Sequence, residues 1–220
     1  KIENILKNLK KRKLVDIVSN PEFLREGEAI RDFIYPDRVV IGTDSKKANK
    51  ILKSLYMPII KKNSRYFNTS RRGAELIKYA SNAFLATKIS FINEIANLCE
   101  KTGIDVKDIS FGMGLDERIG DRFLRAGPAY GGSCFPKDTR ALIDTGKKFK
   151  TDLSIVKTVV SSNDKRRFLS IKRVEKILNN KLSNKAITFL GVTFKPNTDD
   201  MREASSIPMI NYFNKKNCKI

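Results

Sequence analysis

The longest run of regularly spaced apolar residues lies between positions 74 and 102 and predicts one long helix. The apolar positions are Leu76, Ile77, Ala80, Phe84, Ala86, Ile89, Phe91, Ile92, Ile95 and Leu98. They occupy more than one face of the helix, and Gly103 follows as the glycine that commonly ends a helix. A helix that is apolar almost all round must be covered by other helices or by a second subunit.

Shorter patterns before the long helix alternate between strand and helix. In order, they predict an amphipathic helix at 2–12, a buried strand at 14–18, a helical turn opened by Asn20 and Pro21, a strand at 38–41 closed by Gly42, and a helix from Asp44 or Ser45 to about Leu55. Asn20 suits an N-cap and Pro21 the first helical position. This alternation is typical of the end of an α/β domain with a parallel sheet.

The segments after the long helix are first helical and then mixed. Helices are predicted at 105–111, 136–148 and about 153–178, a buried strand at 186–190 followed by Gly191, a helix at 205–214, and the start of a strand at 217–220. A second α/β domain therefore begins near residue 184. Because the sequence begins with Lys1 and stops at Ile220 inside an apolar–polar pattern, we expect a fragment of a longer protein.

The formal net charge of +20 allows several partners. A basic balance can indicate nucleic acid, an acidic membrane surface or a small anionic substrate. The densest basic run, at 7–13, has no interleaved aromatic residues for stacking on bases. We therefore favour solvated surface lysines and expect no nucleic acid, although a basic nucleic-acid-binding module stays the alternative outside enzymes. No apolar run reaches about 18 residues, so we expect no membrane partner.

The cysteine and histidine content limits the chemistry. Three widely spaced cysteines without a CxxC pair argue against a disulfide framework and against a zinc or other metal site. A reducing cytoplasm fits this usage. Since the sequence has no histidine, a cysteine–histidine catalytic pair is impossible, and any base must be Glu, Asp, Lys or water.

The segment from Gly127 to Asp138, GPAYGGSCFPKD, carries the strongest chemical signal. Its glycines allow a backbone to approach a ligand. If Pro136 lies in the first turn of a helix, Cys134 stands at the positive end of that helix beside Lys137, which favours the thiolate. A buried, inert cysteine is the usual alternative for a lone cysteine, but this combination favours a nucleophile. Cys99 and Cys218 fall in apolar segments and are expected in the core.

Three further segments hold paired polar residues. In NPEFLRE, Glu22 and Glu26 are four residues apart and would share a helical face, either in solvent or with one acting as a base. Lys78 and Asn82 have the same spacing at the start of the long helix, and are either a surface pair or donors for a negative oxygen. The basic loop at 194–202 follows a predicted strand, where α/β sheets bind anions, although it could be an ordinary surface loop.

Together these segments resemble the UDP-glucose/GDP-mannose dehydrogenase family. The resemblance rests on NPEFLREG…PDRVVIG, AELIKYASNAFLATKISFINE, DERIGDRFLRAGPAYGGSCFPKD and GVTFKPNTDDMRE, and spans about residues 14 to 216. It implies an α/β protein with the end of an NAD-binding Rossmann domain at 1–68, a central helical dimerisation domain at 69–182, and the start of a Rossmann-like UDP-binding domain at 183–220. The helix at 74–102 would form a homodimer. The Gly-rich fingerprint for the NAD phosphates is not in the sequence, so we expect this piece to be inactive alone.

The resemblance also implies a reaction and the residues for it. UDP-glucose would be oxidised twice to UDP-glucuronate, with two NAD reduced and Cys134 holding the aldehyde as a thiohemiacetal and then a thioester. The implied catalytic residues are Cys134, Lys78, Asn82, Asp138 and Glu22. The implied cofactor-binding residues are Glu26, Lys137 and Arg202. The implied substrate-binding residues are Phe23, Leu24, Arg25, Lys78, Arg118 (reaching the neighbouring subunit's substrate), Phe123, Tyr130, Gly131, Gly132, Phe194 and Lys195.

Two alternatives and one departure from the family remain at this point. GDP-mannose or another nucleotide sugar is the alternative substrate, but PDRVVIG and GGSCFPKDT favour UDP-glucose. An inactive scaffold that dimerises through the long helix is the other alternative. The family usually has glycine where Ala129 stands, and we expect the methyl group to be tolerated if φ is negative there.

Overall fold

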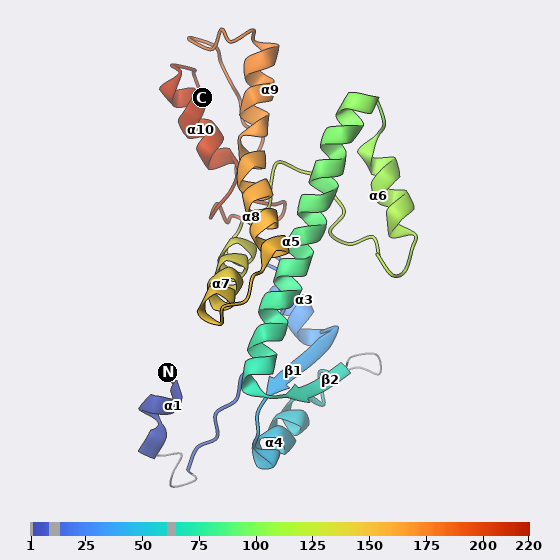
Figure 1. Cartoon of the computed structure of the whole chain (residues 1–220), viewed down its shortest axis with the longest axis vertical. Coiled ribbons are helices and arrows are strands. Elements are labelled where there is room, and N and C mark those ends of the chain that lie inside the picture. Colours follow the sequence, from blue (N-terminus) through green and yellow to red (C-terminus); the bar gives the residue numbers. More distant parts are fainter. Residues whose placement is uncertain (1, 9–13, 61–64) are drawn as a thin grey trace. The chain divides into compact units, whose positions relative to one another are not determined.

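The computed structural model describes residues 2–8, 14–60 and 65–220 (Figure 1). The chain divides into two compact units, Lys1–Ala80 and Ser81–Ile220, which are described separately below. The division falls inside the long helix α5, Arg71–Thr102. The predicted division into three domains, at residues 68 and 182, stays a prediction.

The first unit contains a strand–helix–strand motif. Strand β1 (Arg38–Gly42) and strand β2 (Arg65–Thr69) pair in parallel, with Arg38 opposite Arg65 and Gly42 opposite Thr69. Helix α4 (Lys46–Tyr56) connects them, and the Ser45 side chain caps it by accepting a hydrogen bond of 3.1 Å from Ala48 N. The predicted strand at 38–41 and the predicted helix after Ser45 are thus confirmed, whereas β2 was not predicted.

Gly42 is required by close packing at the end of β1. A methyl group built on Gly42 would lie 2.6 Å from Cβ of Ala74 and 2.7 Å from Cα of Arg71. Ala74 is itself fully buried. The first turn of α5 therefore packs directly on the backbone at the end of the strand, which a side chain at residue 42 would prevent.

Several predictions for the first unit are wrong. Residues 14–18 form no strand: apart from one antiparallel bridge between Ser19 and Gly42, no described residue pairs with this stretch. Residues 20–25 are not helical, because Asn20 uses its amide for long-range contacts: it donates to Val40 O at 3.1 Å and accepts from the Tyr56 hydroxyl. The first helix of this region is α3, Ala29–Ile34. Helix α1 spans Ile2–Ile5, and part of the predicted helix at 2–12 lies outside the described residues.

The second unit contains the rest of α5 and five further helices among the described residues. These are α6 (Val106–Gly114), α7 (Phe135–Lys148), α8 (Ser154–Arg167), α9 (Leu169–Ile177) and α10 (Ser206–Lys215). The predicted stretch at 153–178 is two helices, because Phe168 N bonds to Lys165 O instead of continuing the helical ladder. Gly103 follows α5 with φ +74°, as its predicted role requires.

Helix α5 buries only one of its faces in this unit. Ala83, Ala86, Ile92, Ala96 and Cys99 are buried, whereas Phe84, Phe91 and Leu98 are 66%, 47% and 59% exposed. We expected other helices or a second subunit to cover this helix. Within the described residues, one face of the helix is covered and the other is exposed.

The last part of the unit repeats the strand–helix–strand connectivity in outline. Ala186 and Lys219 form a parallel bridge on either side of α10. The predicted buried strand at 186–190 is wrong in its extent, because Leu190 is 97% exposed and the pairing stops after this one bridge. Ile171, Leu182, Phe213 and Cys218 form a small core beneath it. No helix in the described part of the chain combines the length and apolarity needed to cross a membrane.

Candidate active site

Cys134 stands at the start of helix α7. It occupies the N-cap position, Pro136 lies in the first turn, and Asp138 N donates a hydrogen bond of 2.8 Å to Cys134 O. Its Sγ lies 3.6 Å from Oγ of Ser133. Cys134 is partly exposed, while Cys99 and Cys218 are buried. The predicted location of the thiol at a helix N-terminus is confirmed, and so are the two core cysteines.

A glycine turn leads into Cys134 and is covered by the loop at 194–203. Gly132 has φ +78°, and a methyl group built on it would lie 2.7 Å from the Phe194 ring. A methyl group on Gly131 would lie 2.5 Å from Glu203 O. In addition, Gly132 N donates a hydrogen bond of 2.8 Å to Arg202 O. The turn needs glycine for both its conformation and its space.

Asp138 is a buried carboxylate with an amide partner from α5. The residue is 2% exposed, and Asn82 Nδ2 donates a hydrogen bond of 2.6 Å to its Oδ2. Lys137 Nζ lies 3.7 Å from the other oxygen, with its own side chain 74% exposed. Cys134 and Asp138 at the start of α7 and Asn82 on α5 therefore lie in one unit, and this hydrogen bond joins the two helices. One of the two Asn82 amide hydrogens is already used by Asp138.

Lys78 and Glu22 form an ion pair in the first unit. Lys78 Nζ donates to Glu22 Oε1 at 2.9 Å and to Glu22 O at 2.5 Å. Glu22 Oε2 also accepts a hydrogen bond of 2.7 Å from Leu24 N, within the NPEFLRE segment. The expectation that Glu22 and Glu26 share a helical face is wrong, because this segment is not helical.

Aromatic and cationic contacts fix the same segment. The Phe23 ring has the Arg38 guanidinium 4.1 Å from its centroid and the Lys78 ammonium 5.6 Å away. Arg25 binds Asp32 with two guanidinium bonds, of 2.9 and 2.6 Å. The bond from the Arg25 side chain lowers the pKa of the Asp32 carboxyl. No sequence pattern indicates a role for Asp32, because its partner Arg25 is seven residues away in an irregular segment.

Two of the predicted substrate-binding residues are the aromatic residues Tyr130 and Phe123. Tyr130 is 6% exposed and meets the Phe135 ring edge-on, with centroids 6.0 Å apart. Burial raises the pKa of its hydroxyl. Phe123 has φ +66°, an uncommon conformation for a bulky residue that tends to occur at functional sites. Ala129 is not among the residues with positive φ, so the condition for tolerating its methyl group is met.

Two predicted binding residues carry exposed or partly exposed charges. Arg118 is 89% exposed and bound to Asp116, with Nη2 and Oδ2 2.6 Å apart. The main chain of its loop is held by Lys88 Nζ, which donates to Ile119 O at 2.8 Å. The ammonium of Lys195 lies 5.7 Å from the centroid of the Phe194 ring.

A cavity of about 450 Å³ lies elsewhere in the second unit. Its lining includes Cys99, Ile104, Gly127 and Arg166 but not Cys134. The cavity is therefore not where Cys134 lies. We assign the candidate site from the residues around Cys134 instead.

Comparisons with known proteins agree on one family. Sequence models of the UDP-glucose/GDP-mannose dehydrogenase family match in chain order: the NAD binding domain at residues 1–60, the central domain at 72–165 and the UDP binding domain at 188–220.

Individual relatives match over nearly the whole chain. A UDP-glucose 6-dehydrogenase from Rhizobium meliloti strain 1021 is 49% identical over 95% of this chain and 48% of its own length. The enzyme of that name from Bacillus subtilis strain 168 is 50% identical over 88% of this chain and 43% of its own length. The solved UDP-glucose dehydrogenase from Pyrobaculum islandicum superposes with a TM-score of 0.89 at 37% identity, over 97% of this chain and 49% of that one. The chain thus spans about half the length of these relatives.

Proposed function

Because this chain belongs to the UDP-glucose/GDP-mannose dehydrogenase family, we propose that it carries the catalytic residues for the NAD-dependent oxidation of UDP-glucose to UDP-glucuronate. The observation that supports this most is the placement of Cys134. It is a partly exposed thiol at a helix N-terminus, behind a glycine turn and one helical turn before a buried acid. This arrangement suits a covalent nucleophile.

The thiol gives the second oxidation its covalent hold. In the proposed step, the sulfur of Cys134 bonds to the C6 aldehyde carbon and the carbonyl oxygen takes up a proton, giving a thiohemiacetal. Oxidation of this adduct leaves a thioester, and water then cleaves the C–S bond to release the carboxylic acid and the thiol. Without such a bond, the aldehyde could leave before the second oxidation.

The polar residues nearby take the oxyanion and proton roles. Asn82, with one amide hydrogen bound to Asp138, uses the other to stabilise negative charge on the C6 oxygen, together with Lys78. Asp138 and Glu22 handle the protons and position the water. The ion pair between Lys78 Nζ and Glu22 Oε1, at 2.9 Å, supports the proposal that these two residues act together.

Some residues of this chain are suited to bind parts of NAD. The exposed cations of Lys137 and Arg202 suit its phosphates, and the parallel β1–α4–β2 motif is a type of unit on which dinucleotides bind. Glu26 is proposed to lie near the nicotinamide. When bound, NAD would accept the hydride in each oxidation.

The proposed substrate is UDP-glucose, the sugar nucleotide in the names of the relatives above. Its sugar would contact the segment Phe23–Arg25, Phe123 and the turn at Tyr130–Gly132, while Phe194 and Lys195 would bind from the loop after residue 190. GDP-mannose is the alternative substrate.

Self-association and location complete the proposal. The exposed Phe84, Phe91 and Leu98 are spaced seven residues apart on α5 and form an apolar stripe for pairing with a second copy. Arg118 would then reach the substrate of the neighbouring subunit. A reducing cytoplasm is the proposed compartment, since Cys134 acts as a thiol.

NADH formation tests the proposal. The protein, expressed from its complete reading frame, is offered UDP-glucose or GDP-mannose in parallel. Two NADH per UDP-glucose support the proposal, turnover of GDP-mannose alone overturns the substrate, and turnover of neither overturns the function. DNA binding that weakens steeply with salt would instead support the basic-module alternative.

A further inference from the structure

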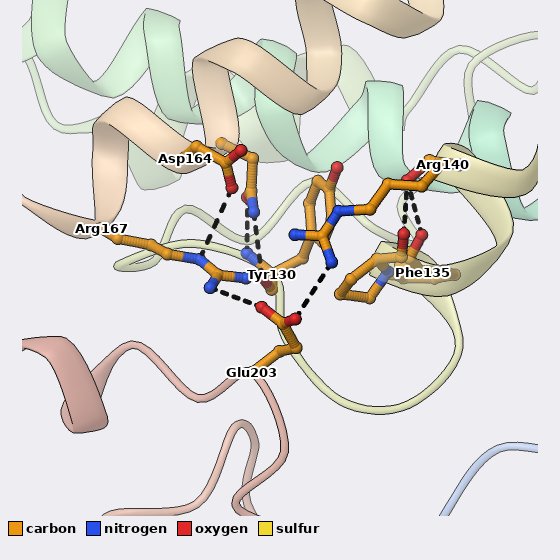
Figure 2. A network of polar contacts seen from close by, with 9 residues as sticks. Tyr130, Phe135, Arg140, Asp164, Arg167 and Glu203 are labelled. Carbon is orange, nitrogen blue, oxygen red and sulfur yellow. Dashed lines mark hydrogen bonds and ion pairs between the residues drawn. The ribbon is translucent and has the colours of Figure 1, made fainter. Parts of the chain in front are cut away.

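Glu203 is held between two arginines from different helices (Figure 2). Arg140, on α7, donates from Nη1 to Oε1 at 3.0 Å, and Arg167, on α8, donates from Nη1 to Oε2 at 2.7 Å. The two donors lie 63 and 36 residues from Glu203 in the sequence. We call these three residues the Glu203 clamp. It ties the loop before α10 to the helix that Cys134 begins.

The opposite charges of Glu203 and its arginines stabilise each other in the clamp. Hydrogen bonds from Arg167 and then Arg140 lower the pKa of the Glu203 carboxyl. The Arg167 side chain is 13% exposed, and its Nε and Nη2 have no hydrogen-bond partner among the described residues. Asp164, 4.0 Å from Nε, is its other acidic neighbour. A neutral residue at position 203 would therefore leave a largely buried guanidinium short of counter-charge.

The backbone beside the clamp touches the glycine turn before Cys134. Gly132 N donates to Arg202 O at 2.8 Å, and Glu203 O occupies the space that a methyl group on Gly131 would need. Glu203 itself has φ +53°, a conformation that a non-glycine residue keeps only when its surroundings impose it. The two arginines bind the side chain of that residue, so they act on the backbone that meets the turn.

We propose that Glu203 is a positioning residue, which through Arg140 and Arg167 fixes the backbone at 202–203 and so holds the Gly131–Gly132 turn that sets the place of the Cys134 sulfur. Glu203 does not touch the reacting atoms in this account. The importance of Cys134 rests on the proposed function, whereas the ordering of the turn does not.

Amide hydrogen exchange at Gly132, followed by NMR, tests the ordering directly. In Glu203→Gln, which keeps the shape and removes the charge, we expect Gly132 to exchange at least about tenfold faster, and in Arg140→Gln by a smaller factor because Arg167 still binds Glu203. Asp144→Asn is the matched control, since it removes an exposed ion pair with Lys147 on the same helix. Ile92, fully buried in α5, reports global opening.

The outcomes separate the possibilities. Faster exchange at Gly132 with Ile92 unchanged supports the proposal. Exchange at Gly132 within about twofold of the parent, or an equal acceleration at Ile92, overturns it. If Glu203→Gln does not fold, Arg140→Gln gives the same decision.

Turnover supplies the second readout. Glu203→Gln is expected to lower kcat about tenfold, because the sulfur is displaced, and to raise KM for UDP-glucose by a smaller factor, because the displaced Gly131–Gly132 turn also contacts the sugar in the proposed function. An equal loss in Asp144→Asn, or an effect on KM alone, overturns the positioning role. If Cys134→Ser leaves turnover intact, the proposed function fails, but exchange at Gly132 still decides whether the clamp orders the turn.

Discussion

Asn82 and Asp138, 56 residues apart in the sequence, share a buried hydrogen bond of 2.6 Å. It joins the long helix α5 to the helix that begins at Cys134. Because Asp138 is 2% exposed, this amide takes the place of water at one carboxylate oxygen. The pair therefore connects the stability of the second unit to the proposed chemistry.

Removing this amide should destabilise the protein. In Asn82→Ala, Asp138 stays buried but loses its donor, and we expect the free energy of unfolding to fall by about 1–3 kcal/mol. Urea-induced unfolding measures this. Asn211→Ala, at an exposed position of α10, is the control and should change little. Equal stability of the two variants would contradict a structural role for the pair.

Two glycines with similar φ separate conformational strain from crowding. Gly103 and Gly132 have φ +74° and +78°, but a methyl group on Gly103 meets nothing within 4 Å, whereas one on Gly132 meets the Phe194 ring. We expect Gly103→Ala to cost about 1 kcal/mol of unfolding free energy and Gly132→Ala at least about 1 kcal/mol more. Urea unfolding of both variants checks this. A similar cost in both would show that the loop at 194–203 does not confine the turn.

The Arg25–Asp32 pair should stabilise the first unit in a pH-dependent way. The folded-state pKa of Asp32 is lowered from its ordinary 3.8, chiefly by the hydrogen bond from Arg25. Its contribution is therefore present above pH 3.8 and is lost as the pH falls through the lower folded value. Since Arg25 is half exposed, we expect less than about 1 kcal/mol.

Asp32→Asn measures that contribution. The difference in unfolding free energy between parent and variant should be larger near about pH 7 than near about pH 3. A difference that is the same at both values, or larger in acid, has the wrong sign for this assignment.

Self-association should depend on the exposed stripe of α5. Phe91, at the centre of this stripe, is 47% exposed, and Phe91→Glu would place a charge in the proposed contact. Sedimentation equilibrium should give a dimer for the parent and a monomer for Phe91→Glu. Phe149→Glu, at a 67% exposed aromatic beyond the end of α7, is the control and should leave the dimer intact. A monomeric parent, or a dimer that survives Phe91→Glu, would contradict the proposed interface.

The sequence predicts features that depend on local chemistry. The long helix follows from sustained periodicity, and its end from Gly103. The position of Cys134 at a helix start follows from Pro136 two residues later. In each case, the residues that decide the structure are neighbours along the chain.

The errors arise where distant residues decide. Apolar residues at 14–18 resemble a strand, but a strand needs a partner, and periodicity does not reveal one. Asn20 is of a residue type that often caps helices, but its side chain forms hydrogen bonds with Val40 and Tyr56 instead. The Asn82–Asp138 bond and the Glu203 clamp join segments that are far apart in the sequence, so no local sequence pattern predicts them.

The most direct test of the central claim is to look for the covalent intermediate on Cys134. The protein, expressed from its complete reading frame, is quenched with acid during turnover of UDP-glucose and NAD, and its peptides are analysed by mass spectrometry. The account predicts a sugar-nucleotide adduct on the peptide that contains Cys134, with no adduct and no complete oxidation in Cys134→Ser. Formation of two NADH per UDP-glucose by Cys134→Ser, without an adduct in the parent, would contradict it.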